Sequence, residues 1–325
     1  PPLLSSIRRH TRYKDWSRGL GDVYKRQRTR SYELQWASTH NRPSMNATTS
    51  GESLNLTNEH MHWPTVRGST DLSNDLKRRI RLGVAHTLRA GSWLTGAKAG
   101  QPRILMYHRV RAGNPGDSLC VDPALFADQI AWLAEHAALV PLREISDQDL
   151  DTDGRCRVAI TFDDGYLDNL VDALPVLEKH GVPATLFVTS EFCDQSLVHP
   201  RYQDEKGQVH MNWEQVRAWD AVDGLEIGSH TLTHPTLPLV DDAQAEKEII
   251  ESRKRVQDGS GSPVDYFAYP NGAYIERDVA LCQRAGYAGA VTTHPGSVSG
   301  NVSRFELKRT EMNDKDHAAE IGLKL

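Results

Sequence analysis

Apolar residues between positions 101 and 312 fall into short runs that alternate with longer segments of helical spacing. The short runs predict strands at 103–108, 157–163, 184–190, 225–230, 266–270, 288–293 and 304–310. The longer segments predict helices at 122–137, 167–181, 212–222, 241–257 and 276–286. Buried strands that alternate with amphipathic helices predict a parallel sheet covered by helices, either as a barrel or as an open doubly wound sheet. In both architectures the chemistry gathers at the C-terminal ends of the strands.

Residues 1–80 are more polar than the rest of the chain. Residues 22–27 (DVYKRQ) look like the translated end of a transposon adapter used to build sequencing libraries, so we expect residues 1–44 to be an adapter artefact or disordered. Residues 45–100 are expected to form a polar extension, with a basic amphipathic helix near 76–94 that contacts a membrane surface or the domain. The main domain and a C-terminal tail are expected at 101–313 and 314–325.

Charge and apolar content exclude some classes of protein. The chain has 38 basic and 43 acidic residues and a formal net charge of −5, which argues against a dedicated nucleic-acid-binding protein. No apolar stretch approaches the ~20 residues that span a bilayer, and His86 and Arg89 interrupt what would be the apolar part of a signal peptide. We therefore expect a cytoplasmic protein as the chain is written, or a protein of the cell envelope if the true N-terminus is missing. The four cysteines are scattered and suit buried hydrophobic positions.

Polar side chains follow several of the predicted strands at the point where each strand ends. They are His108, Asp163 with Asp164, His230, Asn271 and His294. His234 lies four residues after His230, so the two imidazoles can converge on one ion. Two neutral imidazoles and one carboxylate, with positions left open for water, are typical of a catalytic divalent-metal site. One aspartate of the adjacent pair can then bind the metal while the other stays free as a base.

Simpler explanations exist for each motif alone. A histidine pair at this spacing is more often not a metal site, and an adjacent aspartate pair is more often a helix cap or a turn. Their places after separate predicted strands favour the metal site. A non-haem iron oxygenase also uses two histidines and a carboxylate, but usually in the order H-x-[DE] and then His, on a β-sandwich. A non-catalytic sugar-binding module would not need Asp163.

These residues resemble the motifs of the polysaccharide deacetylases of carbohydrate esterase family 4. Thr161–Gly165 matches the family's TFDDG motif, and His230–His234 matches its H-[ST]-x-x-H motif. The resemblance covers roughly residues 101–312 and implies a distorted (β/α)7 barrel. It also implies that Asp163 is the general base, and that Asp164, His230 and His234 bind a divalent metal. Zinc is the expected ion, with cobalt, nickel and iron as alternatives.

The third family motif, R-x-P-Y, is altered in this chain. Ala268 stands where the motif has Arg, and Asn271 stands where it has Tyr. By the resemblance, the Arg orients the catalytic aspartate, so another group must do so here. The backbone N–H of Asn271 can still serve as an oxyanion donor, because a backbone donor does not depend on the side chain.

The general acid also departs from the common pattern, which takes it from a late L-x-H motif. Here that motif reads TTH and ends at His294. The segments 104–110 and 267–272 resemble the circularly permuted branch that includes bacterial poly-β-1,6-N-acetylglucosamine deacetylases. In that branch the acid histidine follows the first strand. His108 is therefore the preferred general acid, and His294 is the alternative.

The resemblance thus implies a metal-dependent hydrolase that removes acetyl groups from N-acetylated sugars of a bacterial polysaccharide. An O-acetyl esterase, a small-amide hydrolase and a non-catalytic glycan-binding module are the alternatives. Candidate substrate-binding residues are Tyr269, Pro270 and Trp213, with core packing as the alternative for the aromatic ones. The expected partner is an N-acetylated glycan, with no nucleic acid, and the oligomeric state is left open.

Overall fold

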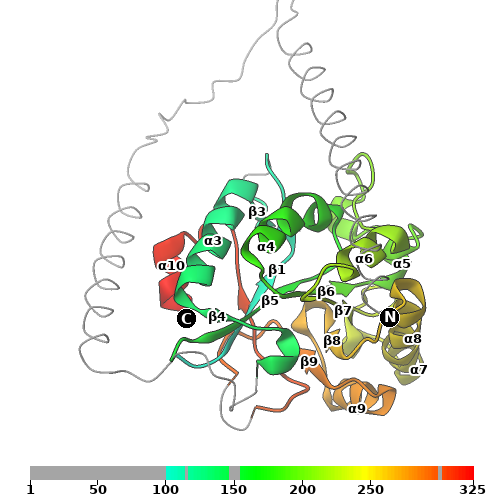
Figure 1. The fold of residues 1–325 in the computed structure, drawn as a ribbon. Coiled ribbons are helices and arrows are strands. Elements are labelled where there is room, and N and C mark those ends of the chain that lie inside the picture. The colour runs from blue at the N-terminus through cyan, green and yellow to red at the C-terminus, as the bar shows by residue number, and fades with distance from the viewer. Residues whose placement is uncertain (1–99, 114–115, 146–153, 299–301) are drawn as a thin grey trace, which may run out of the picture. The chain divides into compact units, whose positions relative to one another are not determined.

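The computed structural model describes residues 100–113, 116–145, 154–298 and 302–325 (Figure 1), which belong to one compact unit. The predicted adapter artefact at 1–44 and the predicted amphipathic helix at 76–94 lie outside these residues. So does the rest of the predicted extension, apart from Gly100.

A curved parallel sheet forms the centre of the fold. Its strands follow the order β10-β1-β5-β6-β7-β8-β9, and the short strand β4 pairs with the start of β5. The strands are β1 Arg103–Tyr107, β4 Ala138–Leu139, β5 Arg157–Phe162, β6 Ala184–Val188, β7 Leu225–Ser229, β8 Tyr266–Ala268, β9 Gly289–Val291 and β10 Thr310–Glu311. A separate two-stranded pair joins β2 Arg109–Val110 to β3 Cys120–Val121. An observed strand overlaps each of the seven predicted strands, although β10 shares only Thr310 with the predicted strand 304–310.

The segment 304–311 joins the two edges of the main sheet. Its first part pairs with β9, where the Thr292 N–H donates to the Leu307 carbonyl at 2.8 Å. Its last part pairs in parallel with β1, where Thr310 lies opposite Leu105. The sheet therefore curls into a distorted (β/α) barrel, and the predicted fold class is confirmed.

Helices lie on the outside of the sheet (Figure 1). They are α3 Pro123–His136, α4 Leu174–His180, α5 Ser190–Cys193, α6 Trp213–Asp220, α7 Asp242–Glu246, α8 Ser252–Ser260, α9 Glu276–Ala285 and α10 Ala318–Lys324. Two of the predicted helices contain a π-helical turn, at Asn169–Ala173 before α4 and at Lys247–Glu251 between α7 and α8. No helix in the described part of the chain is long and apolar enough to cross a membrane.

Local sequence explains where these helices begin and end. The Asp122 carboxylate accepts a hydrogen bond from the Ala124 N–H at 2.9 Å and so caps α3. Asn212 and Gln215 form a reciprocal capping box at the start of α6. Gly181 ends α4 in the left-handed conformation, with φ of 62°.

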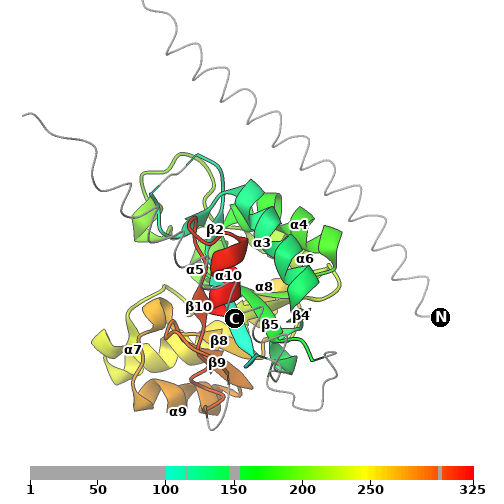
Figure 2. The same ribbon diagram turned by 90° about the vertical axis from the view of Figure 1, so that its left-hand side faces the viewer.

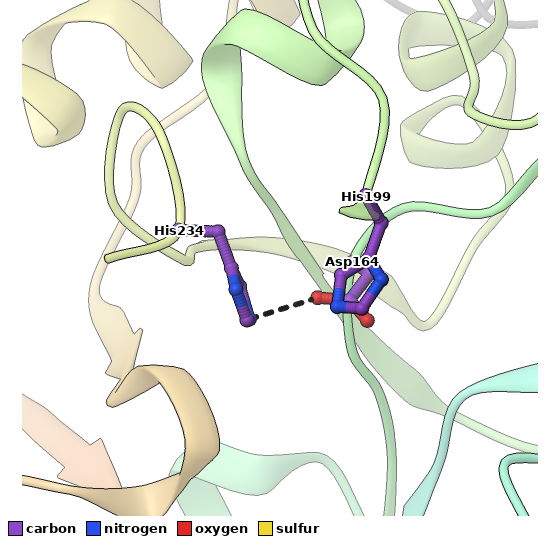
Figure 3. Close-up of side chains that lie close together, drawn as sticks. All are labelled: Asp164, His199 and His234. Atoms are coloured by element: carbon purple, nitrogen blue, oxygen red, sulfur yellow. Dashed lines mark ion pairs between the residues drawn. The ribbon is translucent and has the colours of Figure 1, made fainter. Parts of the chain in front are cut away.

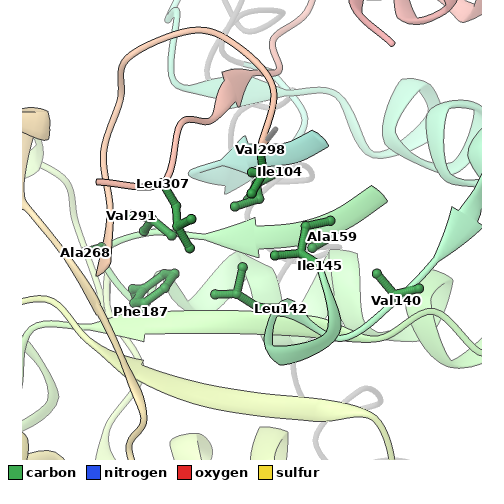
Figure 4. Packing of buried hydrophobic residues seen from close by; sticks show 10 residues of the cluster. All are labelled: Ile104, Val140, Leu142, Ile145, Ala159, Phe187, Ala268, Val291, Val298 and Leu307. Atoms are coloured by element: carbon green, nitrogen blue, oxygen red, sulfur yellow. The ribbon is translucent and has the colours of Figure 1, made fainter. Parts of the chain in front are cut away.

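The interior of the barrel is apolar at one end and polar at the other. The apolar part is a cluster of buried side chains from five strands and their loops (Figure 4): Ile104, Val140, Leu142, Ile145, Ala159, Phe187, Ala268, Val291, Val298 and Leu307. Arg309 is fully buried, and its guanidinium carbon lies 5.7 Å from the centre of the Phe187 ring. The buried Asp163 directly follows β5, so the polar end of the interior lies at the C-terminal ends of the strands, where the sequence predicts the active site.

The C-terminal residues pack against the rest of the described structure. In Figure 2 the helix α10 lies beside β10, and it also contacts α3. Ile321 of α10 is fully buried, and the Gln129 side chain of α3 donates to the Asp316 carbonyl at 2.8 Å.

Candidate active site

Asp163 is held by a buried arginine from the other end of the domain. Arg309 donates from Nη1 to one carboxylate oxygen and from Nη2 to the other, each at 2.7 Å. Arg309 is itself fixed, since its Nε donates to the Thr292 carbonyl at 2.8 Å and its Nη1 also donates to Thr161 Oγ1 at 3.1 Å. This guanidinium orients the aspartate in the way that the Arg of the third family motif is expected to do.

The charge state of Asp163 follows from this pairing. Burial alone would raise the pKa of the carboxyl group, but the Arg309 guanidinium outweighs burial and lowers the pKa below its ordinary value. Asp163 is therefore an ionised carboxylate at neutral pH. Each oxygen keeps lone pairs with which it can accept a further proton or hydrogen bond.

The neighbouring Asp164 faces the two histidines of the H-x3-H motif. Its Oδ1 lies 3.5 Å from Nε2 of His230 and 3.3 Å from Nε2 of His234. This Oδ1 is buried and has no hydrogen-bond partner among the described residues. The predicted ligand set is thus brought together around one carboxylate oxygen, and Figure 3 shows His234 approaching it.

The protonation of His230 makes this arrangement fit a cation. Its Nδ1 lies 2.8 Å from the Ala268 carbonyl, which can only accept, so Nδ1 carries the proton and Nε2 keeps a lone pair. Burial lowers the pKa of His230 to about 4, so the ring stays neutral at pH 7. A carboxylate oxygen and an imidazole lone pair then face each other at 3.5 Å, which is unfavourable unless a positive ion lies between them.

Unusual backbone conformations gather at this site. Five non-glycine residues described by the structure have positive φ, and four of them are Asp164, Thr231, His234 and Asn271. Such conformations cost roughly 1–3 kcal/mol each and persist only where the surroundings enforce them. For the His230–His234 loop the enforcing group is Glu248, a fully buried carboxylate in the π-helical turn. It accepts from the N–H groups of Leu232 at 2.9 Å and Thr233 at 3.0 Å.

The two candidate general acids lie in different surroundings. His108 follows β1, and a positive charge on its ring would lower the pKa of both Asp163 and Asp164. Its Nδ1 is buried and has no hydrogen-bond partner in the described part of the chain. His294 is exposed, with its ring centre 5.9 Å from that of Tyr274. The geometry therefore favours the assignment of His108.

The predicted substrate-binding residues differ in exposure. Tyr269 and Pro270 are buried, and the Tyr269 hydroxyl donates to the Phe305 carbonyl at 3.1 Å. Trp213 is half-buried, and its Nε1 donates to Asp194 at 2.6 Å. Asn271 is exposed with φ of 57°, and the described residues give its backbone N–H no hydrogen-bond partner.

Sequence reasoning missed three residues of this site. Arg309 acts through Asp163, and Glu248 acts through the His230–His234 loop. The third is His199, which together with Asp164 and His234 forms a group whose ligand atoms all lie within 4.8 Å of one another (Figure 3). No sequence signal singles out Arg309, because the predicted strand 304–310 carries three other charged residues.

Comparisons with known proteins identify the family of this chain. A polysaccharide deacetylase family model matches residues 151–290. The YxkH protein of Bacillus subtilis (strain 168), whose name places it among polysaccharide deacetylases, is 33% identical to the chain over 236 residues. These residues make up 71% of this chain and 78% of YxkH.

Two solved structures share the fold at lower sequence identity. The Streptococcus pyogenes deacetylase PplD, in complex with acetate, has a TM-score of 0.61 at 22% identity, over 70% of this chain and 98% of PplD. A de-N-acetylase from Aggregatibacter actinomycetemcomitans has a TM-score of 0.60 at 18% identity, over 70% of this chain and all of the other (100%). Since the sequence relationship to YxkH extends over most of both proteins, the chain belongs to the polysaccharide deacetylases of carbohydrate esterase family 4, enzymes that remove acetyl groups from polysaccharides.

Proposed function

We propose that this deacetylase is a divalent-metal-dependent hydrolase of N-acetyl groups on N-acetylglucosamine-type sugars. The observation that carries the proposal is the different environment of the two adjacent aspartates. Asp163 is bound through both oxygens to Arg309, whereas Asp164 turns an unpaired oxygen toward two imidazoles. One carboxylate is arranged for proton transfer and the other for binding a cation.

Asp164, His230 and His234 would hold the ion. One carboxylate and two imidazoles leave positions open, as in catalytic rather than structural zinc sites, and Zn²⁺ is the ion we expect, with Co²⁺, Ni²⁺ or Fe²⁺ as alternatives. When bound, such an ion supplies Lewis-acid polarisation of the acetyl carbonyl and lowers the pKa of a water molecule.

The remaining chemistry belongs to side chains and backbone groups of this chain. Asp163 accepts the proton of the attacking water, a contribution of order 10²–10⁴ in rate. The Asn271 N–H stabilises the negative charge that develops on the acetyl oxygen. His108, in its protonated form, donates to the amine nitrogen as the bond to the acetyl carbon breaks, so acetate and a free amine leave.

A surface pocket next to Asn271 offers room for neighbouring sugars. It has a volume of about 530 Å³ and includes Gly272, Tyr274 and Glu306 in its lining. The Tyr274 hydroxyl donates to Glu306 at 3.0 Å, which holds the ring in place. An aromatic ring beside a carboxylate suits the apolar face and the hydroxyl groups of a pyranose.

Exchange of each aspartate for asparagine tests the division of roles. Asp163→Asn should lower kcat by at least about 10²-fold while zinc still binds, because the ligand set is intact. Asp164→Asn should instead lose zinc affinity. The measurements are acetate release from β-1,4- and β-1,6-linked N-acetylglucosamine oligomers and a chelator-competition Kd for Zn²⁺, on full-length protein stripped of metal and reloaded. Loss of zinc from Asp163→Asn would mean that the two roles are reversed.

The substrate class is tested in the same assay. Metal-dependent acetate release from either oligomer would support the proposed N-deacetylase, and the preferred linkage would identify the polymer. Release from O-acetylated sugars only, with zinc bound, would favour the O-acetyl esterase.

A further inference from the structure

The group of side chains around Asp164 contains a third imidazole, His199, that the mechanism above does not use. His199 lies directly before the 3₁₀ turn Pro200–Tyr202, in the segment between α5 and α6. Its ring centre is 5.2 Å from that of His234, and the two rings meet at 67°. Figure 3 shows His199 and His234 approaching Asp164 from different sides.

The segment that carries His199 is fastened to the catalytic loop by another histidine. Nδ1 of His210 lies 2.9 Å from the Asp164 carbonyl, to which it can only donate. Nε2 of His210 is therefore unprotonated, and it accepts a hydrogen bond from the backbone N–H of His199 at 3.1 Å. One neutral imidazole thus links the backbone of Asp164 to the backbone of His199.

Further contacts make this link rigid. The His210 ring is stacked between Tyr166 and Phe192, with ring centres 4.8 Å and 4.3 Å away. On either side of His210 the backbone pairs with the chain that follows Asp164, through Leu167 N–H to the Val209 carbonyl and Met211 N–H to the Gly165 carbonyl, each at 2.9 Å. The fold therefore holds His199 beside the metal site instead of leaving it on a free loop.

The hydrogen bonds of His199 decide which role its ring can take. The Arg201 N–H donates to Nδ1 of His199 at 3.2 Å, which uses the lone pair of that nitrogen. A neutral His199 must then carry its proton on Nε2, and a protonated nitrogen cannot bind a metal. His230 has the opposite tautomer, with Nδ1 protonated and Nε2 free. Of these two rings, His230 is therefore suited to be a ligand and His199 to be a donor.

We propose that His199 is a catalytic residue whose Nε2–H donates a hydrogen bond to the acetyl oxygen of the substrate as negative charge develops on it. This inference rests on the proposed function. It gives the site a side-chain donor in addition to the Asn271 N–H, in a chain where Asn replaces the motif tyrosine. It also assigns His210 as a positioning residue, because its contacts are with the backbone of His199 and Asp164 and not with the acetyl group.

The test separates a donor from a metal ligand. His199→Ala should lower kcat by about 10²-fold, the usual effect of removing one oxyanion donor. The chelator-competition Kd for Zn²⁺ should stay within about threefold of the wild-type value, and the visible spectrum of the Co²⁺ form should be unchanged. Both are expected because a hydrogen-bond donor that does not bind the metal leaves the ligand set unaltered. His199→Gln keeps a side-chain N–H and should recover part of the rate that His199→Ala loses. His317→Ala removes an exposed imidazole and is the control, with kcat expected to stay unchanged.

Binding of acetate provides a readout that does not need turnover. Acetate affinity of the zinc-loaded protein should fall about tenfold in His199→Ala. His210→Leu should produce a similar loss, and the double variant should lose little more, because both changes remove the same hydrogen bond.

Two results would overturn the proposal. A rise of more than about tenfold in the zinc Kd of His199→Ala, with an altered Co²⁺ spectrum, would make His199 a ligand. Unchanged kcat and unchanged acetate affinity would give it no role in the reaction. If the wild-type protein releases no acetate from any glycan, the proposed function fails, while acetate binding to the zinc-loaded variants still decides the role of His199.

Discussion

Asp163 and Arg309 form the contact on which the reactivity of the site depends, and they are 146 residues apart in the sequence. Both are buried, so each buried charge is compensated by the other instead of by water. The bidentate geometry fixes the plane of the carboxylate, which a single point charge would not do. At the residue scale, Arg309 is therefore expected to matter for both stability and turnover.

Arg309→Met should lower the free energy of unfolding by roughly 3–5 kcal/mol, because it leaves the Asp163 carboxylate buried without a partner. It should also abolish most of the acetate release. Urea unfolding and the glycan assay measure the two effects. Arg309→Lys keeps the positive charge but cannot form the bidentate pair. Compared with Arg309→Met, it should therefore recover more of the free energy of unfolding than of kcat.

A second-site variant distinguishes orientation from general damage. Ala268→Arg in the Arg309→Ala background restores a guanidinium at the position where the family motif has one. Recovery of part of kcat would support the orienting role. If Arg309→Met instead retained full activity, the assignment of Asp163 as an oriented base would be wrong.

The sequence contained enough to predict the residues whose roles depend on local spacing. Asp163, Asp164, His230 and His234 are recognisable because each pair lies within one short motif at the end of a predicted strand. Arg309 and Glu248 act on those motifs from distant parts of the chain, and nothing in their own neighbourhoods indicates a partner. His199 was out of reach for the same reason, because its place beside Asp164 depends on the contacts of His210.

At the scale of elements, the π-helical turn Lys247–Glu251 positions the carboxylate that holds the His230–His234 loop. It interrupts the predicted helix 241–257 and places Glu248 beneath the loop between the two metal-site histidines. Oε1 of Glu248 accepts from the Thr233 hydroxyl at 2.7 Å and from the Gln244 side chain at 2.8 Å. Helical periodicity predicts the helix but not the extra residue of a π turn, because the apolar spacing on either side looks regular.

Glu248→Ala should weaken zinc binding by about tenfold or more, since groups that hold metal-site loops commonly affect affinity to this extent. Without the carboxylate, two backbone N–H groups lose their acceptor, and His234 is freer to leave its positive-φ conformation. The chelator-competition Kd for Zn²⁺ measures the effect. Glu251→Ala, at an exposed position in the same turn, is the matched control, and equal behaviour of the two variants would contradict the role given to Glu248.

For the whole molecule, the two neutral buried histidines predict how stability depends on pH. Burial lowers the pKa of both His210 and His230 from 6.5 to about 4. Between these values the unfolded chain binds a proton at each position that the folded protein does not. The free energy of unfolding of the metal-free protein should therefore fall as the pH falls, by about 1.4 kcal/mol per pH unit for each histidine.

Urea unfolding of metal-free protein at pH 7 and pH 5 measures this dependence. His210→Gln should reduce the difference, because one of the two groups no longer titrates. An equal pH dependence in the wild-type protein and in His210→Gln would show that the fold does not hold the His210 ring neutral.

The closure of the barrel by residues 304–311 has a consequence for how activity arises. The same short segment pairs with both edges of the sheet and carries the guanidinium that orients the base. A chain in which this segment has not docked can have its other strands in place and still lack an oriented Asp163. Acetate release therefore reports that residues 304–311 have docked onto the sheet. During refolding, activity should return when this segment docks and not when the earlier strands form.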